Sequence, residues 1–234
     1  MNPVPRPSPR STVVPAWLHG AWIRRHRSFG DGPVGERSDV AWLQVGPWFA
    51  DLRIPRLGQQ ADHPFDQTRA FSGRFEVIET HSRGATVAWH HDIDTEARTG
   101  GEPDTAVVTL RDGMLVESGT GYTETWGHPD GEGSSGVVLI QQAGPARREI
   151  KDPTDHEADG SAITARVVCV GTTAIAVWRE PRPGGARFKG FPWWEPIHVV
   201  GSLPPPSDLL VALQAVGTGD PLPGRWRQQD EPAW

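Results

Sequence analysis

Apolar and polar residues alternate with a period of two along most of the chain, and turn residues interrupt the alternation every ~8–12 positions. Successive side chains of a strand point to opposite faces, so this pattern predicts strands with one apolar face. Short strands at such spacing are typical of an all-β sandwich or barrel. The predicted strands are residues 18–26, 38–45, 48–55, 70–80, 85–94, 105–111, 114–118, 121–127, 136–143, 147–151, 162–170, 173–180 and 196–202.

Turn residues mark hairpins between these strands. The Asp-Gly of "RDGM" (111–114) predicts a tight turn, and "VGTT" (170–173) joins two β-prone runs. One stretch predicts a helix, "PSDLLVALQAVG" (206–217), which Ser207 can cap and Gly217 can end. Its single apolar stripe predicts that it packs on the outer wall of a barrel.

The chain divides into three parts on this basis. Four prolines in the first nine residues indicate a disordered leader, residues 1–16. The strands predict a barrel over 17–204, and 205–234 hold the helix and a loose tail. Two Gly- and Pro-rich stretches, 127–136 and 180–196, are interpreted as long loops near the barrel mouth.

Composition narrows the class of protein. A net charge of -6, spread without blocks, argues against nucleic acid or an anionic membrane as partner. The single cysteine, Cys169 in "VVCVG", excludes an internal disulfide and fits a buried position in a reducing compartment. The N-terminus has no apolar signal region, and no window is long enough to span a bilayer. We therefore expect a cytoplasmic protein. A homodimer stays open as an alternative to a monomer, because Trp226 and Trp234 in the tail could contact a second subunit.

Several motifs together resemble a known type of barrel. "GAW" at 20–22 is similar to the Gly-x-Trp that opens lipocalins, where the glycine bends the chain and the tryptophan closes one end. "DVAWLQVGPWFADLRIP" (39–55), "VAWHHDID" (87–94), "LVESGTGYTETW" (115–126) and "IHVVGSLP" (197–204) resemble an uncharacterised family of bacterial lipocalin-like proteins. The resemblance implies an antiparallel up-and-down barrel. It departs at His91, where the family has an arginine.

Strand alternation then indicates which side chains share the barrel interior. Trp89 shares a face with His91, whereas His90, Asp92 and Asp94 take the opposite face and are expected outside. Aromatic walls with a few converging polar groups are typical of a small-molecule cavity. The residues predicted to bind a ligand are Trp22, Arg24, Trp42, Gln44, Phe75, Trp89 and Trp126.

Three other interpretations of these residues stay open. Arg24 or Arg53 could pair with Asp51 or Glu124 in a network that only shapes the barrel. A metal at "HHDID" is disfavoured because adjacent histidines of a strand point to opposite faces. Haem through one histidine has no supporting motif. The histidines that could act as an axial ligand of haem are His19, His63, His81, His91, His128, His156 and His198.

The function favoured by the sequence is that of an enzyme without cofactor or metal. It would bind a small apolar molecule of polyketide or terpenoid type and catalyse cyclisation, isomerisation, hydration or dehydration. Glu124 is the predicted acid or base, since Tyr122 and Trp126 should desolvate it and raise its pKa. Arg53, Tyr122, His91 and Gln44 would orient the substrate. The alternatives are a carrier or sensor that only binds, and a scaffold whose aromatic stretch 188–194 docks a protein.

Overall fold

The described residues of the computed structural model are almost entirely strands. They are 13–30, 32–34, 37–56, 69–94, 101–129, 136–142, 163–170, 173–179, 186–191 and 226–228. The elements are η1 (Ala16–Leu18), β1 (Gly20–Phe29), β2 (Gly32–Val34), β3 (Ser38–Val45), β4 (Trp48–Pro55), β5 (Arg69–His81), β6 (Gly84–Asp94), β7 (Asp104–Arg111), β8 (Met114–Gly119), β9 (Tyr122–Gly127), β10 (Gly136–Gln142), β11 (Ile163–Val170), β12 (Thr173–Arg179), β13 (Ala186–Phe191) and β14 (Trp226–Gln228). No helix among these residues is long and apolar enough to cross a membrane.

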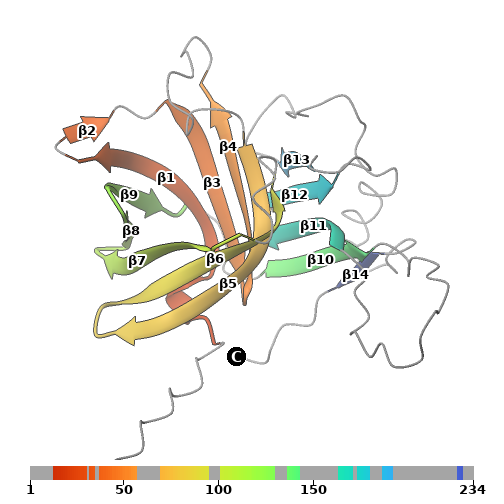
Figure 1. The fold of residues 1–234 in the computed structure, drawn as a ribbon, viewed down its shortest axis with the longest axis horizontal. Coiled ribbons are helices and arrows are strands. Elements are labelled where there is room, and N and C mark those ends of the chain that lie inside the picture. The colour runs from red at the N-terminus through yellow and green to blue at the C-terminus, as the bar shows by residue number, and fades with distance from the viewer. Residues whose placement is uncertain are drawn as a thin grey trace, which may run out of the picture.

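Strands β1 and β3 to β9 form a closed antiparallel barrel of eight strands (Figure 1). Each pairs with the next along the chain, and β9 pairs back onto β1 from Gly127 opposite Ile23 to Tyr122 opposite Phe29. The short β2 pairs with the last residues of β1. The predicted all-β barrel is confirmed. The barrel strands lie between Gly20 and Gly127, well within the stretch 17–204 that was predicted as barrel.

The predicted Asp-Gly turn joins β7 and β8. Asp112 and Gly113 both have positive φ values, 50° and 78°, between the paired residues Arg111 and Met114. Two central residues with positive φ match the right-handed twist of the flanking strands. This dipeptide therefore fixes the register of the hairpin, as the sequence predicted.

The later strands form a second sheet against the outside of the barrel. Its order is β13-β12-β11-β10-β14, and it contacts β3 and β4 (Figure 1). The buried interface joins two sets of apolar side chains. From β3 and β4 they are Ala41, Leu43, Val45, Ala50, Leu52 and Ile54, and from the second sheet Val138, Ile140, Val168, Val170, Ile175 and Val177. Strands β3 and β4 are thus covered on both faces, which accounts for consecutive apolar residues such as those from Val40 to Leu43.

Two segments differ from the prediction. The stretch 180–196, predicted as a loop, contains β13, and the predicted loose tail contains β14. Both are edge strands of the second sheet, paired with β12 and β10. Their basic and glycine residues conceal the alternation, and pairing with a neighbouring strand overrides that weak local signal. Residues 1–12, 130–135, 147–151, 196–202 and the predicted helix 206–217 lie outside the described residues.

A buried arginine fastens the second sheet to the barrel. Arg166 of β11 is 0% exposed, and its Nη2 donates a hydrogen bond of 2.7 Å to Oδ2 of Asp92 on β6. Its guanidinium also lies 4.6 Å from the ring centre of Trp48 on β4. Burial lowers the pKa of Arg166, and the Asp92 carboxylate opposes that change. The carboxylate therefore compensates for a charge that would otherwise be costly to bury.

Replacing Asp92→Asn should destabilise the protein by about 2–4 kcal/mol, because Arg166 would stay buried without its carboxylate. The free energy of unfolding in urea measures this loss. A matched control is Asp39→Asn, whose partner Arg56 lies 3.0 Å away with both side chains nearly half exposed. This control should lose less than about 0.5 kcal/mol. Equal losses in the two variants would contradict the role assigned to Arg166.

Candidate functional site

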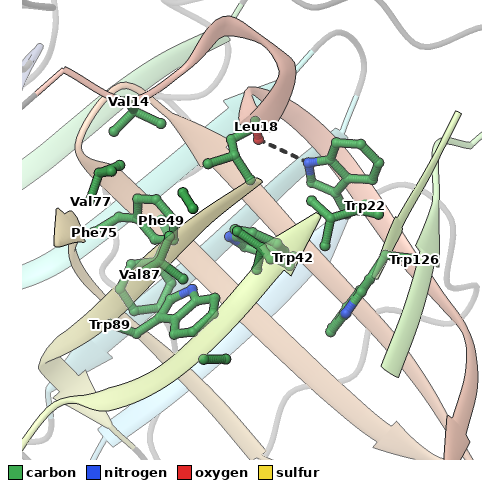
Figure 2. Packing of buried hydrophobic residues seen from close by; sticks show 14 of the residues in the cluster. Val14, Leu18, Trp22, Trp42, Phe49, Phe75, Val77, Val87, Trp89 and Trp126 are labelled. Carbon is green, nitrogen blue, oxygen red and sulfur yellow. Dashed lines mark hydrogen bonds between the residues drawn. The ribbon is translucent and has the colours of Figure 1, made fainter. Parts of the chain in front are cut away.

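One end of the barrel is closed by residues that precede β1. Gly20 adopts a φ of +128°, which lets the chain bend from η1 into the strand. Trp22 is then fully buried, and its Nε1 donates a hydrogen bond of 2.9 Å to the carbonyl oxygen of Leu18 (Figure 2). Val14 packs in the same cluster. The Gly-x-Trp motif therefore closes one end of the barrel.

The half of the interior next to this closed end, the closed half, is filled by aromatic rings around Trp42 (Figure 2). Its ring centre lies 6.5 Å from that of Trp22, 5.7 Å from Trp89 and 5.8 Å from Trp126. Phe75 lies 5.9 Å from Trp42 and 5.4 Å from Trp89. These are the separations of rings in direct contact. The rings therefore pack on one another and leave no large cavity between them.

Gln44 belongs to this closed half. Its Oε1 accepts a hydrogen bond of 3.1 Å from Trp42 Nε1, and its Nε2 donates one of 2.6 Å to the Gly46 carbonyl oxygen. Gln44 is 0% exposed. Its amide therefore orients the central indole ring, and the structure places it apart from the pocket described next.

The open half of the barrel holds a pocket of about 280 Å³. Its lining is Arg27, Phe29, Arg53, Arg69, Pro103, Asp104, Thr105, Glu117, Thr120, Tyr122 and Glu124. A recess of about 40 Å³ also reaches Trp42, Phe71, Trp89 and Trp126. The expected aromatic lining is found only in this recess. We name the larger space the mouth pocket, and charged side chains form most of its wall.

A bulge in β1 brings two arginines into the interior. The pairing of β1 with β9 shifts register between Arg24 and His26, so an extra residue enters the strand. Arg24 and Arg27 are therefore both buried, 3% and 1% exposed, while Arg25 and His26 face outward. Strict alternation from the inward-facing Trp22 correctly predicts that Arg24 faces inward but predicts that Arg27 faces outward.

Two acids face each other across the hairpin of β8 and β9. Glu117 pairs with Glu124, and both are buried. Glu124 accepts a hydrogen bond of 2.7 Å from Arg24 Nη1. Glu117 accepts a hydrogen bond of 2.7 Å from the Tyr122 hydroxyl. The ring of Tyr122 lies directly over Gly119, and any side chain at position 119 would overlap that ring. Glu124 is thus neutralised by a guanidinium, whereas Glu117 is held by a phenol.

This difference makes Glu117 the unusual acid. Burial and the charge of Glu124 raise the pKa of Glu117 to about 8, although the hydrogen bond from Tyr122 acts in the opposite direction. Burial and the charge of Glu117 also raise the pKa of Tyr122 well above its usual range. At neutral pH both groups therefore carry their protons, and the Glu117 carboxyl can donate its proton to a bound molecule.

Opposite these acids lies an ion pair on β4. Arg53 Nε donates a hydrogen bond of 2.8 Å to Asp51 Oδ1. Burial by itself would lower the pKa of Arg53, but the carboxylates of Asp51 and Glu124 raise it above its usual value. The Arg53 guanidinium lies 5.2 Å from the ring centre of Phe71, and that of Arg69 lies 4.9 Å from it. This aromatic ring holds both cations beside the mouth pocket.

His91 lies beside the mouth pocket rather than in its lining. As expected, it faces inward, and its ring stacks on Phe71 at 4.3 Å. Its Nδ1 is 2.7 Å from Asp94 Oδ2, and its Nε2 is 3.5 Å from Oδ2 of Asp104, which lines the pocket. The expectation that Asp94 faces outward is wrong. The register shift around Asp92 inserts one residue into β6 and turns Asp94 inward.

The polar side chains of "HHDID" bind separate partners. His90 Nε2 is 2.8 Å from Glu76, Asp92 binds Arg166, and Asp94 binds His91. Within the part of the chain that the structure describes, no three histidine, cysteine or acidic side chains are grouped as a metal site would require.

Of the predicted site residues, Arg53, Tyr122 and Glu124 line the mouth pocket, and Trp42, Trp89 and Trp126 line its recess. Arg24 lies behind Glu124, while Trp22, Gln44 and Phe75 belong to the closed half. Eight residues of the mouth-pocket lining were not predicted from the sequence, and the four charged ones are Arg27, Arg69, Asp104 and Glu117. Glu117 could have been found, because the turn after Gly119 sets it opposite Glu124.

Comparison with known proteins gives a fold and no function. No protein family and no curated protein matches the chain. A crystal structure of the uncharacterized protein YLR301w from Saccharomyces cerevisiae is similar, with a TM-score of 0.53 and 11% sequence identity. The match covers 81% of this chain and 90% of the yeast chain, so it must extend beyond the barrel strands. At this identity the likeness concerns the fold alone.

Glu117→Gln should make the protein more stable at alkaline pH. A carboxyl whose pKa is raised from 4.5 to about 8 by folding gives up stability as pH rises through that window. The variant, which resembles protonated Glu117, should therefore match the wild type at pH 4.5. It should exceed the wild type by up to about 5 kcal/mol above pH 8.

Urea unfolding of both proteins at the two pH values measures this difference. Glu102→Gln, at an exposed position, should show no such pH-dependent gain. A constant offset between wild type and Glu117→Gln at all pH values would contradict the raised pKa.

Proposed function

We propose that the protein binds a small molecule in the mouth pocket and that Glu117, held by the Tyr122 hydroxyl, supplies acid–base chemistry to it. The observation that carries this proposal is an open pocket of about 280 Å³ whose wall includes a buried acid protonated near neutral pH. The volume lies near the lower end of the ~300–1,000 Å³ of small-molecule sites. Buried groups with displaced pKa values that line a pocket are typical of functional sites.

The lining changes the expected ligand. A wholly apolar molecule of polyketide or terpenoid type would meet apolar surface mainly in the recess, while the wall of the mouth pocket is charged. A molecule with at least one polar or ionised group suits it better. The resemblance to lipocalin-like barrels supports a binding function in this half of the barrel. The single cysteine supports our placement of the protein in the cytoplasm.

The acid assigned to catalysis also changes. Glu124 is engaged by Arg24 at 2.7 Å, so Glu117 is the better candidate for the group that gives and accepts a proton. Isomerisation, cyclisation and hydration or dehydration all need such a group. The alternative is a carrier that binds without turnover, in which Glu117 would serve only to set the charge of the pocket.

Native mass spectrometry of freshly purified protein tests the binding proposal. Thr120 lies in the exposed turn between β8 and β9 and lines the mouth pocket, so Thr120→Trp should obstruct the pocket and abolish any retained ligand mass. Thr80→Trp, on the exposed end of β5, should leave that mass unchanged. Retention of the same ligand by Thr120→Trp would place its binding elsewhere and contradict the proposal.

Glu117→Gln separates catalysis from binding once a ligand is known. A positioned acid contributes about 10²–10⁴-fold to a rate, so kcat should fall by that factor while the ligand mass is still retained. The wild-type rate should also decrease above pH 8, where Glu117 loses its proton. Unchanged kcat in this variant would favour the carrier.

A further inference from the structure

The charges buried inside the barrel are nearly balanced. Among the described residues, the largely buried charged side chains of the interior and the pocket wall are four arginines and four acids, and Asp104 is a fifth acid in the wall whose side chain is 55% exposed. The arginines are Arg24, Arg27, Arg53 and Arg69, and the acids are Asp51, Asp94, Glu117 and Glu124. Guanidinium groups keep their charge at any ordinary pH, so the protonation of the acids sets the net charge of this region.

Three of the acids lie against cations. Glu124 binds Arg24 at 2.7 Å, and Asp51 binds Arg53 at 2.8 Å. Asp94 lies 2.7 Å from His91 and 3.7 Å from Arg69 Nη2. Glu117 differs, because its hydrogen bond comes from a neutral phenol. With the proton on Glu117, the four arginines exceed the three buried ionised acids by one charge, and the opposing charge of Asp104 lies half exposed to water.

A surplus cation is costly in a poorly solvated site, and an anion from solution can relieve that cost. Arg27, Arg53 and Arg69 all reach the wall of the mouth pocket, where such an anion can approach them. The acid closest to solvent there is Asp104, whose side chain is 55% exposed. Water screens its opposing charge more effectively than it screens the buried groups.

The recess adds a second requirement. Trp126 is 1% exposed and lines the recess, and its Nε1 has no hydrogen-bond partner. Buried donors of this kind are nearly always satisfied in native proteins. Its other aromatic walls are the rings of Trp42, Trp89 and Phe71, and the polar residues that it shares with the mouth pocket are Arg53, Asp104, Glu117 and Tyr122, with Asp51 beside them. Flat aromatic walls and the available indole donor suit the flat end of a molecule that bears a hydrogen-bond acceptor.

We propose that the ligand of the mouth pocket is a small conjugated carboxylic acid, bound as a monoanion while Glu117 is protonated. Its carboxylate faces Arg27, Arg53 and Arg69, and its far end carries an acceptor into the recess beside Trp126. This inference rests on the proposed binding function and names the chemical class of ligand. Glu117 accordingly couples binding to pH, because its ionisation would place a negative charge in the wall that receives the carboxylate.

Isothermal titration with 4-cyanobenzoate and its uncharged analogue 4-cyanobenzamide tests the proposal. The anion should bind and the amide should bind at least tenfold more weakly. Between pH 6.5 and pH 9, at constant ionic strength, the affinity of the wild type for the anion should fall about tenfold, following the protonated fraction of Glu117. Glu117→Gln should lose this pH dependence. The conservative variant Asp104→Asn should bind the anion about twofold to fivefold more tightly and leave the amide unaffected.

Trp126→Phe tests the recess. It should remove the preference of the wild type for 4-cyanobenzoate over benzoate, because only the former carries an acceptor at its far end. Persistence of that preference would overturn the role of Trp126. Amide binding as tight as that of the anion, or a pH dependence that persists in Glu117→Gln, would overturn the anionic ligand.

Absence of binding by all three probes would also overturn this ligand class. The proposed binding function is judged separately, by the ligand mass retained in the wild type and lost in Thr120→Trp. The two proposals can therefore fail independently.

Discussion

The contact of Trp42 with the three other indole rings divides the barrel into two halves, and the candidate site depends on that division. On one side of this layer the interior is closed by η1 and apolar side chains. On the other side, β1, β4, β8 and β9 continue, so their inward positions must be filled by other residues. The chain fills them with long charged side chains that pair along the wall, and the pocket is the space left between them. Burying so many charges is tolerable only because most have a partner at hydrogen-bonding distance.

Much of the fold could be predicted because alternation is a local property of the sequence. The strand that contains Trp22 and Arg24, and the one that contains Tyr122, Glu124 and Trp126, present the faces that their sequence predicts. The errors in side-chain direction occur where one residue is inserted into a strand. The bulges beside Arg25 and at Asp92 reverse the faces that follow, so that Arg27 and Asp94 lie inside. No local pattern indicates such a bulge.

The second sheet and the division of the interior depend on tertiary contacts. Strands such as "ITARVVCV" carry apolar residues on both faces, interrupted only by Thr164 and Arg166 on one of them, which suits a sheet covered on both sides better than the wall of a barrel. That the indole rings would pack on each other, rather than line a cavity, follows from distances between four strands. The fold shared with the yeast protein at 11% identity carries no information on this point, since the charged wall belongs to individual side chains.

The second sheet covers the outer faces of β3 and β4, whereas Val107 and Leu110 on β7 remain 39% exposed. Arg53 therefore stands on a wall two layers thick, and Glu117, Tyr122 and Glu124 stand on strands that the described part of the second sheet does not cover. A doubly supported wall deforms less than a single one. Thermal fluctuations of the barrel should thus displace Glu117 and Glu124 on β8 and β9 more than Arg53 on β4. The entrance of the mouth pocket should therefore widen mainly by movement of β8 and β9.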